Sequence, residues 1–338
     1  MKKKINIAVL GATGAVGEAM LDILAKRKFP FGEIYALASK RSEGQTVLCG
    51  NKTLDVLDVA KFDFSKVQIA LFSAGGKVSA KYAPKATKAG CIVIDNTSHF
   101  RQDPDVPLII PEINHEKIAE YTNKNIIANP NCATIQMLVA LKPIYDAVGI
   151  NRITVATYQS VSGTGKAAIS ELIMQTSQLL NGKSVNVEVY PQQIAFNVLP
   201  HIDDFMSNGF TKEEMKMIWE THKIFGDDKI VINPTTVRVP VIYGHSEAIT
   251  IETRKPLKAD KAKDLLQNAP GIKVMDGGKK YPTPFKDAVG RDEVFVGRIR
   301  NGIDDEHTLN LWVVSDNVRK GAALNSVQIA EILVDKYL

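Results

Sequence analysis

The sequence predicts an α/β protein with two domains, and three observations support this. Short β-branched runs alternate with helical stretches over the first third of the chain, which is typical of βαβ units around a parallel sheet. Longer strands with alternating apolar and polar residues follow in the second half, as expected of a broad mixed sheet. The length of 338 residues exceeds what one ordinary hydrophobic core accommodates.

Each predicted strand of the first third is followed directly by glycine or a small polar residue. We expect strands at residues 5–10, 34–38, 67–72 and 92–95, and helices at residues 14–28 and 77–89. The residues that directly follow the four strands are Gly11, Ser39, Ser73 and Asn96. Ligands of open parallel sheets bind beyond the carboxyl ends of the strands, so these four turns are expected to share one ligand-binding edge.

From about Asn131 the pattern changes to longer elements. We expect helices at residues 133–147, 166–180 and 211–225, strands at 152–159, 236–242, 248–253 and 308–314, and a final helix at 317–338. Thr211 and Glu214 have the spacing of a capping box at the start of the third helix.

The composition is that of a globular protein, with 45% hydrophobic and 23% charged residues. No apolar run of the sequence approaches the ~20 residues of a membrane span. The basic start runs through a short apolar stretch into a glycine turn without a cleavage site, so we expect a first strand and a cytoplasmic protein, not a signal peptide. The net charge of +5 is spread along the chain, which argues against a nucleic-acid-binding block.

A glycine-rich turn, Gly11-Ala-Thr-Gly14-Ala-Val-Gly17, follows the first strand and opens the first helix. Glycine permits a tight turn and close approach to a pyrophosphate, and the helix N-terminus offers free N–H groups. Glycine triplets also occur in turns that bind nothing, but the strand-turn-helix context favours a dinucleotide. The second strand leads into Ser39-Lys40-Arg41-Ser42, where NAD enzymes usually carry Asp or Glu, so we expect NADP in preference to a merely solvated basic turn.

The three cysteines, Cys49, Cys91 and Cys132, share no metal-ligand spacing, and no metal site is expected. Cys132 opens a predicted helix, and a helix N-terminus lowers the pKa of a thiol and favours the nucleophilic thiolate. Cys91 is expected to pack in an apolar strand and Cys49 to lie in a polar turn. Buried structural cysteines are common, so Cys132 taken alone is only a candidate nucleophile.

One histidine is a candidate partner for this thiol. A thiol that forms a thiohemiacetal needs a base to take its proton, and His245, between two predicted strands, is suitable. The chain has six histidines. Most histidines in proteins lie on the surface, or are buried with their hydrogen bonds satisfied, and have no catalytic role. Position in the sequence therefore does not by itself select His245.

Nine short motifs follow one another from residue 5 to the C-terminus. They are the glycine turn, Phe72-Ser-Ala-Gly-Gly76, Asp95-Asn-Thr-Ser98, Asn129-Pro-Asn-Cys132, Tyr158-Gln-Ser-Val-Ser-Gly163, Glu220-Thr-His-Lys223, Arg238-Val-Pro-Val241, Gly244-His-Ser-Glu247 and Asp316-Asn-Val-Arg-Lys-Gly-Ala-Ala-Leu-Asn325. Together and in this order they resemble the aspartate-semialdehyde dehydrogenase family. The resemblance implies a homodimer whose subunit has a Rossmann-type NADP-binding domain at residues 1–131, completed by residues 317–338, and an α+β catalytic and dimerisation domain with a mixed sheet at residues 132–316.

The family's reaction is the reversible, phosphate-dependent reduction of 4-phospho-L-aspartate by NADPH to L-aspartate 4-semialdehyde. The resemblance implies that it proceeds through an acyl-thioester on Cys132, with His245 as acid/base and Gln159 orienting substrate and thiol. Covalent catalysis of this kind divides one difficult reduction into two easier steps. The reaction belongs to the biosynthesis of lysine through diaminopimelate, of methionine and of threonine.

The resemblance also assigns the binding residues. Arg238 is expected to bind the substrate α-carboxylate with a planar fork that lysine lacks, and Glu220 the α-ammonium group. Asn131 is expected beside the thiol, while Arg101 and Lys223 are expected to hold inorganic phosphate or the phosphoryl group. The expected cofactor-binding residues are Gly11, Thr13, Gly14, Ala15, Val16, Ser39, Arg41, Ser42, Ser73, Gly75, Ser162, Gly163 and Asn317.

Some of these residues also have simpler interpretations. Glu220 and Lys223 are three apart on a predicted helix and would otherwise form a surface ion pair worth less than ~1 kcal/mol. Arg101 would otherwise be a solvated loop charge. Departures from the family pattern, Ala133 after the thiol and His222 between the paired charges, remove no group that the chemistry needs.

Two alternative functions remain open at this point. Another acyl-phosphate reductase of similar architecture would act on an N-acetylglutamyl or a glyceraldehyde-type substrate. Arg238 with Glu220 favours a substrate that has both a free carboxylate and a free amine. A non-catalytic NADP-binding sensor would have no use for the thiol, so the intact set of candidate catalytic residues argues against it.

Overall fold

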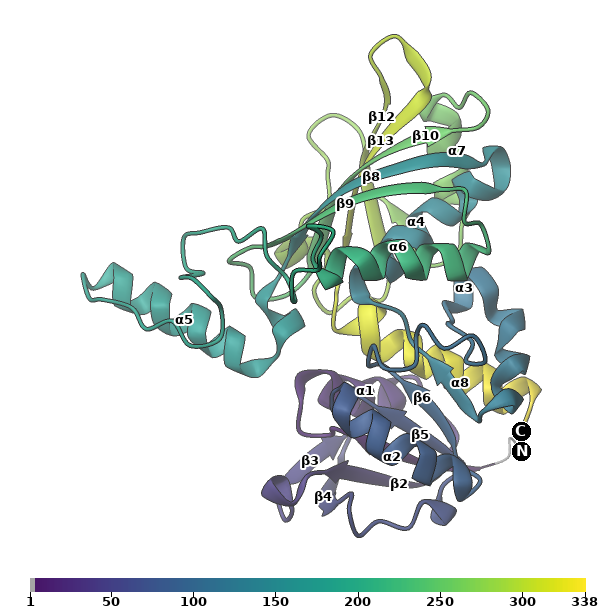
Figure 1. Cartoon of the computed structure of the whole chain (residues 1–338), viewed down its shortest axis with the longest axis vertical. Helices are drawn as coiled ribbons and strands as arrows, with labels where there is room; N and C mark the ends of the chain where they lie inside the picture. Colours follow the sequence, from purple (N-terminus) through teal and green to yellow (C-terminus); the bar gives the residue numbers. More distant parts are fainter. Residues whose placement is uncertain (1–3) are drawn as a thin grey trace. The chain divides into compact units, whose positions relative to one another are not determined.

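The computed structural model describes residues 4–338, and these form two compact units (Figure 1). The first unit comprises the chain up to Asn131 together with Ala322–Leu338, and the second comprises Cys132–Gly321. The C-terminal segment joins the first unit from Ala322, whereas the sequence led us to expect this from Asn317. The basic residues at positions 2 and 3, expected to precede the first strand, lie outside the described residues.

The first unit is built on a sheet that, within residues 4–338, has seven strands in the order β3-β4-β2-β1-β5-β6-β7. The strands are β1 (Ile5–Leu10), β2 (Phe31–Ala38), β3 (Thr46–Cys49), β4 (Lys52–Asp58), β5 (Ile69–Phe72), β6 (Ile92–Asp95) and β7 (Ile126–Ala128). Neighbouring strands are parallel except β3 and β4, which form an antiparallel hairpin at the edge. The predicted parallel α/β sheet is therefore confirmed, although the sequence analysis missed the hairpin and β7.

The four strand ends singled out in the sequence lie along one edge of this sheet. Leu10 at the end of β1 is level with Leu37 of β2 on one side and with Phe72 of β5 on the other. Phe72 is in turn level with Asp95 at the end of β6. The expectation of a shared edge is thus confirmed by the register of the strands.

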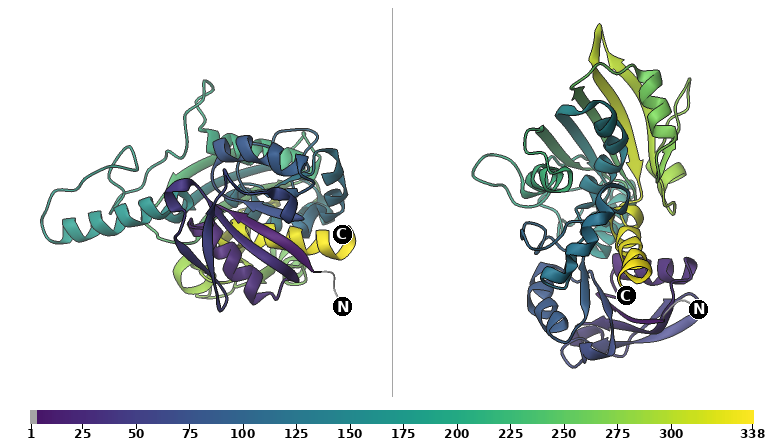
Figure 2. Two further views of the ribbon diagram at one scale, coloured as in Figure 1. Left: turned by 90° about the horizontal axis from the view of Figure 1, so that it is seen from below. Right: turned by 90° about the vertical axis from the view of Figure 1, so that its right-hand side faces the viewer.

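Helices cover both faces of the sheet, as Figure 2 shows. They are α1 (Ala15–Lys26), α2 (Gly76–Lys88) and α8 (Leu324–Lys336), with shorter segments α3 (Pro111–Asn114), η1 (Lys40–Ser42), η2 (Phe64–Lys66) and η3 (His115–Asn123). Ile7 and Val9 of β1 belong to the same buried cluster as Leu21 of α1 and Val327 of α8. The expected helix at residues 317–338 begins instead as a π-helical turn, η6 (Arg319–Ala323), before α8.

Cys49 is a correction to the sequence analysis, because it is buried and not in a polar turn. It ends β3, where side chains alternate between the two faces, so Val47 and Cys49 are both buried while Leu48 is exposed. Its thiol lies 3.4 Å from the carbonyl oxygen of Leu21 on α1. Cys91 is fully buried, as expected.

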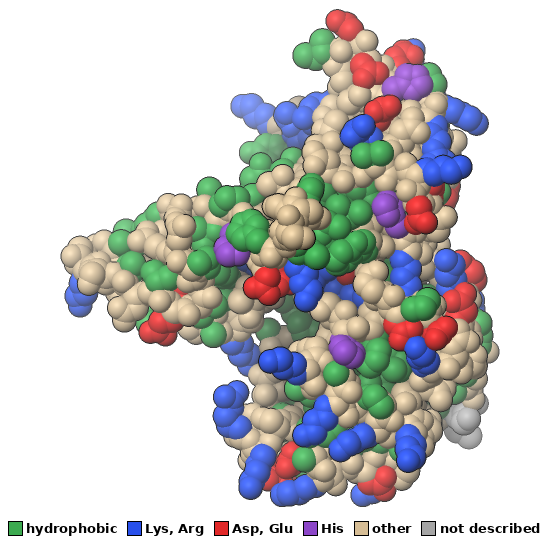
Figure 3. Space-filling view, viewed as in Figure 1, with side chains coloured by type: hydrophobic (Ala, Val, Ile, Leu, Met, Phe, Trp, Pro, Cys, Tyr) green, Lys and Arg blue, Asp and Glu red, His purple; other side chains and the backbone are tan. Residues whose placement is uncertain are grey.

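An exposed row of lysines lies on α2. Lys77, Lys81, Lys85 and Lys88 are three or four residues apart and therefore share one side of the helix. Figure 3 shows many Lys and Arg side chains over the face of the first unit on which α2 lies. Such a surface raises the local concentration of anionic ligands through long-range attraction.

The second unit is built on a mixed sheet, which has six strands among the described residues, in the order β11-β12-β13-β10-β8-β9. The strands are β8 (Ile150–Gln159), β9 (Val231–Arg238), β10 (His245–Thr253), β11 (Ile272–Val274), β12 (Val294–Gly302) and β13 (Asp305–Ser315). β8–β9 and β11–β12 are parallel, and the other neighbours are antiparallel. The predicted mixed sheet is confirmed.

The strand expected at residues 236–242 is wrong in its bounds, because β9 runs from Val231 to Arg238. Beyond Arg238 the chain still contacts the segment that follows β8, since the Val161 N–H donates to the Val241 carbonyl at 2.8 Å, but it is no longer part of the strand. Pro234 within β9 is tolerated because β9 is at the edge of the sheet.

Helix α4 (Cys132–Val148) lies against one face of this sheet and contacts β8, β10, β12 and β13. It also packs against α6 (Lys212–Phe225) and α7 (Ala259–Gln267), so the three helices form one layer. Helix α5 (Lys166–Leu180) extends away from the sheet in both Figure 1 and Figure 2. None of the helices in residues 4–338 combines the length and apolar character that crossing a membrane requires.

The capping box predicted at Thr211 is confirmed. The Thr211 hydroxyl accepts a hydrogen bond from the Glu214 N–H at 3.3 Å, and the Glu214 carboxylate accepts one from the Thr211 N–H at 2.8 Å. The helix ends at Gly226, whose left-handed conformation (φ 65°) suits glycine. Both ends of α6 are therefore defined by the local sequence.

Candidate active site

Cys132 is the first residue of α4 and is partly exposed. The free N–H groups and partial positive charge at a helix N-terminus favour a thiolate at this position. The turn at residues 317–321 lies directly against it, since a Cβ at Gly321 would come within 2.8 Å of the Cys132 Cβ. Only glycine at 321 allows the turn to approach the thiol-bearing residue this closely.

Asn317, in the same turn, connects the surroundings of Cys132 to the start of β10. Its Oδ1 accepts hydrogen bonds from the Gly244 N–H at 2.9 Å and from the hydroxyls of Ser160 and Ser162, both at 3.1 Å. The Asn317 side chain is buried, and its Cβ lies 3.7 Å from the position that a Cβ at Gly321 would occupy. Cys132 and the start of β10 are thus linked through a short chain of contacts.

His245 opens β10 and is fully buried. Its Nδ1 accepts a hydrogen bond from the Ser160 N–H at 3.0 Å, and the Ser160 hydroxyl lies 3.0 Å from the same nitrogen. Burial lowers the pKa of His245 to about 3; the Arg238 charge acts in the same direction and Glu213 opposes it. The ring is therefore neutral at physiological pH.

Arg238 ends β9, paired with Gln159 at the end of β8, and its guanidinium is buried. It donates to the Ser160 carbonyl at 2.6 Å and lies over the Tyr190 ring, with its Cζ 5.9 Å from the ring centroid. A Cβ at Gly163 would lie 3.1 Å from Arg238 Nη1 and 3.4 Å from His245 Nε2. Arg238 and His245 therefore border the same small space, which glycine leaves open.

Gln159 is buried beside them, and both ends of its amide are held. Its Oε1 accepts from the Thr157 hydroxyl at 3.0 Å, and its Nε2 donates to the Glu213 carboxylate at 3.2 Å. Glu213 also accepts from Lys216 at 3.0 Å. If the amide were flipped, its oxygen would face the Glu213 carboxylate, and two acceptors would repel each other. The neighbours of Gln159 therefore determine the orientation of its amide.

The two predicted binding residues on α6 differ in exposure. Glu220 is fully buried, which excludes a solvated surface ion pair, and Lys223 is partly exposed. A carboxylate is rarely buried unless it is paired. The position of Glu220 is therefore that of a partnered group.

The remaining predicted substrate and phosphate residues lie in the first unit, both buried. Arg101 is not a solvated loop charge, because its Nε donates to the Asn129 carbonyl at 2.9 Å and its Nη2 to the Asn96 carbonyl at 2.8 Å. Asn131 is the last residue before α4.

The predicted cofactor residues divide between the two units. Those of the first unit lie at the carboxyl edge of its sheet or at the helix starts beside it: Gly11, Thr13, Gly14, Ala15, Val16, Ser39, Arg41, Ser42, Ser73 and Gly75. Gly11 has φ 89°, and a Cβ there would meet the Ser73 Oγ at 2.9 Å. Gly14 is the N-cap of α1 without a side-chain cap, so it leaves the first-turn N–H groups for a ligand. Ser162, Gly163 and Asn317 belong to the second unit, around His245.

Three residues that contact the predicted site were missed by the sequence analysis: Ser160, Tyr190 and Glu213. Ser160 lies inside the Tyr158–Gly163 motif, but nothing in a motif shows which backbone N–H meets a distant imidazole. Glu213 directly precedes the capping-box residue Glu214, so its sequence position suggests only a favourable negative charge in the first turn of α6. Its contact with Gln159 depends on the packing of α6 against the sheet.

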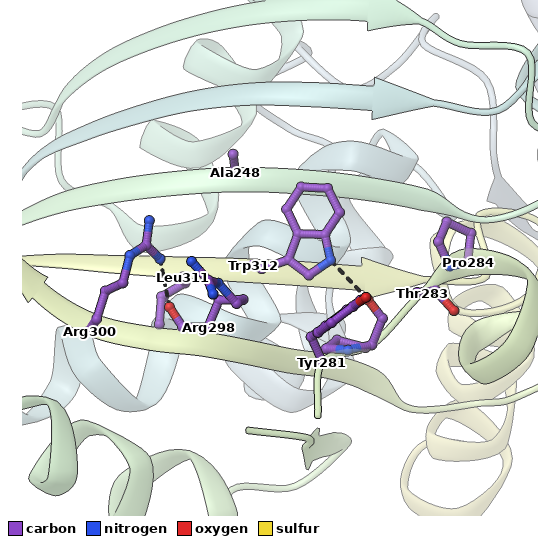
Figure 4. A pocket seen from close by; sticks show the side chains of 9 residues that line it. Ala248, Tyr281, Thr283, Pro284, Arg298, Arg300, Leu311 and Trp312 are labelled. Carbon is purple, nitrogen blue, oxygen red and sulfur yellow. Dashed lines mark hydrogen bonds between the residues drawn. The ribbon is translucent and has the colours of Figure 1, made fainter. Parts of the chain in front are cut away.

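A pocket of about 390 Å³ lies on the opposite face of the second unit's sheet. Figure 4 shows Tyr281, Trp312, Arg298 and Arg300 around it, with Ala248 at its wall. Side chains alternate along β10, so Ala248 points away from the face that carries His245. This pocket is therefore separate from the candidate catalytic residues. Residues 4–338 contain no group of three or more His, Cys, Asp or Glu side chains arranged to hold a metal ion.

Comparisons with known proteins agree along the whole chain. Residues 6–121 match the family model described as semialdehyde dehydrogenase, NAD binding domain, and residues 141–320 match semialdehyde dehydrogenase, dimerisation domain. The aspartate-semialdehyde dehydrogenase of Legionella pneumophila is 63% identical over 340 residues, covering 100% of this chain and 98% of that protein.

Solved structures give the same result. The structure of aspartate semialdehyde dehydrogenase II from Vibrio cholerae complexed with ASA has a TM-score of 0.98 at 60% identity, covering 99% of this chain and 100% of that one. The aspartate semialdehyde dehydrogenase of Candida albicans with NADP has a TM-score of 0.75 at 26% identity, covering 98% of both chains.

Proposed function

Because the chain belongs to the aspartate-semialdehyde dehydrogenase family, we propose that it reduces 4-phospho-L-aspartate to L-aspartate 4-semialdehyde with NADPH, reversibly and with release of inorganic phosphate. It is an oxidoreductase of amino-acid biosynthesis. Its product would supply lysine through diaminopimelate, methionine and threonine. The observation that best supports this function is the arrangement of the site. Arg238 and His245 are buried together beside Gly163, and contacts through Ser160 and Asn317 connect them to Cys132.

Cys132 is the proposed nucleophile that attacks the acyl carbon and forms a thioester. The position at the start of α4 supports this role, because the helix N-terminus stabilises the thiolate and its N–H groups can stabilise an oxyanion. His245 is proposed as the acid/base, the role that the sequence resemblance implies: it supplies the proton to the reacting group at collapse of the thiohemiacetal, or takes it in the reverse direction. Gln159 orients the substrate, and its fixed amide supports that role.

Arg238 is proposed to bind the substrate α-carboxylate. Its guanidinium is buried and its Nε has no hydrogen-bond partner among residues 4–338, so an anion beside it would be favoured. Glu220 is proposed to meet the α-ammonium group, with Asn131 beside the thiol. Arg101 and Lys223 are proposed to hold phosphate or the phosphoryl group.

The cofactor is a nicotinamide dinucleotide, consistent with the matched NAD-binding domain. When bound, it supplies the hydride. We propose that it is NADP, because the exposed turn after β2 carries Ser39 and Arg41, and the nearest following acid, Glu43, is paired with Lys61 at 2.9 Å. The Gly11 turn and the uncapped start of α1 suit the pyrophosphate, and the other residues named above line the same edge or the surroundings of His245.

The assembly and location follow from the family and the thiols. The dimerisation-domain match supports a homodimer. A cytoplasmic location is proposed because free thiols and nicotinamide cofactors suit a reducing compartment. The partners are the small substrate and inorganic phosphate, without nucleic acid or membrane.

The test is a side-by-side assay of the purified protein. Nicotinamide reduction would be followed with aspartate semialdehyde, N-acetylglutamate semialdehyde and glyceraldehyde 3-phosphate, each with and without phosphate and with NADP or NAD. We expect phosphate-dependent activity with aspartate semialdehyde and NADP, lost in Cys132→Ala. Activity with only one of the other two aldehydes would indicate one of the other acyl-phosphate reductases. If the protein has no activity, but substrate still protects its thiol from alkylation, the result would indicate a sensor.

A further inference from the structure

The guanidinium of Arg101 is buried, and two backbone carbonyls hold it in place. Its Nε donates to the Asn129 carbonyl at 2.9 Å and its Nη2 to the Asn96 carbonyl at 2.8 Å. Hydrogen bonds from two nitrogens of one rigid fork fix the plane of the guanidinium as well as its position. A shift of either carbonyl would therefore move the charge that is proposed to hold phosphate.

The two carbonyls belong to asparagines that directly follow neighbouring strands. The N–H of Asn96, after β6, donates to the Phe72 carbonyl at 2.9 Å, and the N–H of Asn129, after β7, donates to the Asp95 carbonyl at 2.8 Å. These bonds hold the peptide group before each asparagine. The carbonyl that faces Arg101 belongs to the peptide group after it.

The peptide group after Asn129 has fewer possible supports than the one after Asn96. The residue that follows Asn96 is Thr97, whose N–H donates to the Asp95 carboxylate at 2.9 Å. The residue that follows Asn129 is Pro130, which has no N–H to donate. Contacts made by the asparagine side chains therefore matter for both carbonyls, and most for that of Asn129.

Two consecutive residues near the start of α8, which contacts β6 (Figure 1), bind these side chains. Asn325 Nδ2 donates to Asn129 Oδ1 at 2.7 Å and to the Ile109 carbonyl at 2.9 Å. A backbone carbonyl can only accept, which fixes the orientation of the Asn325 amide. The Ser326 hydroxyl accepts from Asn96 Nδ2 at 2.7 Å. Asn325 and Ser326 are fully buried, so water could not readily replace either contact.

We propose that Asn325 and Ser326 are positioning residues of the phosphate site, because each supports one of the two asparagines whose carbonyls hold Arg101. Neither residue needs to touch the substrate for this role. The proposal rests on the proposed function, in which Arg101 holds phosphate or the phosphoryl group. It gives α8 a part in phosphate binding in addition to its part in the hydrophobic core of the first unit.

The first test compares Michaelis constants of the whole protein in the direction that consumes phosphate. Ser326→Ala removes the acceptor that holds Asn96 and leaves the backbone of α8 intact. Loss of one hydrogen bond corresponds to about 3- to 10-fold in an equilibrium constant, so KM for phosphate should rise by this factor. KM for aspartate semialdehyde and KM for NADP should hardly change. A general loss of stability would not produce this selective rise.

Asn325→Ala should also raise KM for phosphate, and it should lower kcat because Asn129 lies three residues before the thiol. The matched control is Glu331→Ala, which removes another contact of α8: the Glu331 carboxylate accepts from Arg27 on α1 in two hydrogen bonds of 2.8 Å. This variant should lose stability but keep the wild-type KM for phosphate. A wild-type KM for phosphate in both Ser326→Ala and Asn325→Ala would overturn the proposal.

A double-mutant cycle tests whether Ser326 acts through Asn96. If both side chains serve one contact, the variant with Ser326→Ala and Asn96→Ala should have no higher KM for phosphate than the more affected single variant. Two effects that multiply would show that the residues act independently, and this would contradict the proposed route to Arg101.

The last test observes Arg101 without substrate. In proton–nitrogen NMR of ¹⁵N-labelled protein, the Arg101 Nε–H signal would be assigned by its loss in Arg101→Lys. Its exchange with solvent should be at least ~10-fold faster in Asn325→Ala than in the wild type or in Glu331→Ala. Exchange at the wild-type rate would overturn the positioning role.

These measurements separate the proposal from the proposed function. A wild-type protein that does not use aspartate semialdehyde would refute the proposed function, and the exchange rates would still decide whether α8 positions Arg101. If Arg101→Lys kept the wild-type KM for phosphate in an active enzyme, Arg101 would not belong to the phosphate site and the proposal would be wrong.

Discussion

The amide nitrogen of Gln159 donates to the carboxylate of Glu213 across 3.2 Å, although the two residues lie on β8 and α6. Glu213 is itself held by Lys216, whose ammonium also contacts Asp203 at 2.7 Å. These contacts fix the orientation of the Gln159 amide. One N–H and one oxygen lone pair of that amide remain for a ligand.

Glu213→Gln should therefore lower kcat/KM without unfolding the protein. Loss of a hydrogen bond to a charged group costs about 1.5–3 kcal/mol, which corresponds to roughly 10–100-fold. Glu213→Asp should recover part of the loss. Lys212→Ala, an exposed change on the same helix, is the matched control. Wild-type kinetics in Glu213→Gln would contradict the positioning role.

The buried His245 should make stability depend on pH. Its pKa falls to about 3 in the folded state from an ordinary value of 6.5, so between these values the unfolded chain binds a proton that the folded protein does not. The free energy of unfolding therefore falls as pH falls through this window, by up to about 1.4 kcal/mol per pH unit. His245→Gln should remove that part of the slope in denaturant titrations at pH 4 to 6. The exposed His115→Gln is the control.

Glu247, two residues further along β10, should have the opposite dependence. Burial raises its pKa well above the usual range, and the neighbouring Gln136 amide opposes the shift. Above the ordinary value the unfolded chain releases a proton that the folded state keeps, so stability falls as pH rises. Glu247→Gln should remove this loss and be more stable than wild type at pH 7 in thermal melts. Glu252→Gln, exposed on the same strand, should not do so.

The three thiols should react at different rates with iodoacetamide. Burial raises the pKa of Cys91 to about 12 and also raises that of Cys49, and both side chains are inaccessible. Cys132 is partly exposed at a helix start, so it should be alkylated at least ~10-fold faster, because only the thiolate reacts. Peptide mass mapping over time would measure this. Earlier labelling of Cys49 or Cys91 would refute the prediction.

Cofactor preference should depend on Arg41. Removing a charge-assisted hydrogen bond to the 2′-phosphate costs about 1.5–3 kcal/mol, so Arg41→Ala should raise KM for NADP by about 10-fold or more. KM for NAD should hardly change. Lys88→Ala removes an exposed charge from α2 and serves as the control. Equal effects on both cofactors would argue against a contact with the 2′-phosphate.

Much of the fold follows from local patterns in the sequence. The strand, glycine turn and helix at residues 5–26, the capping box at Thr211 and the start of α4 at Cys132 depend on periodicity and turn chemistry within a few residues. The shared edge of the parallel strands follows from the βαβ order. Motif spacing along the chain also indicated the family and the candidate residues.

The electrostatic state of the site was decided by tertiary structure alone. The Ser160 N–H meets His245 Nδ1 across 85 positions of sequence, and Gln159 meets Glu213 across 54. From the sequence alone, the simplest interpretation of Cys49, Arg101 and Glu220 is a position in a turn or on the surface. All three side chains are buried in the structure. Periodicity reports which face of an element is apolar, but the partner and protonation of a polar group depend on which distant donor, acceptor or charge the folded chain places against it, and this information is not local.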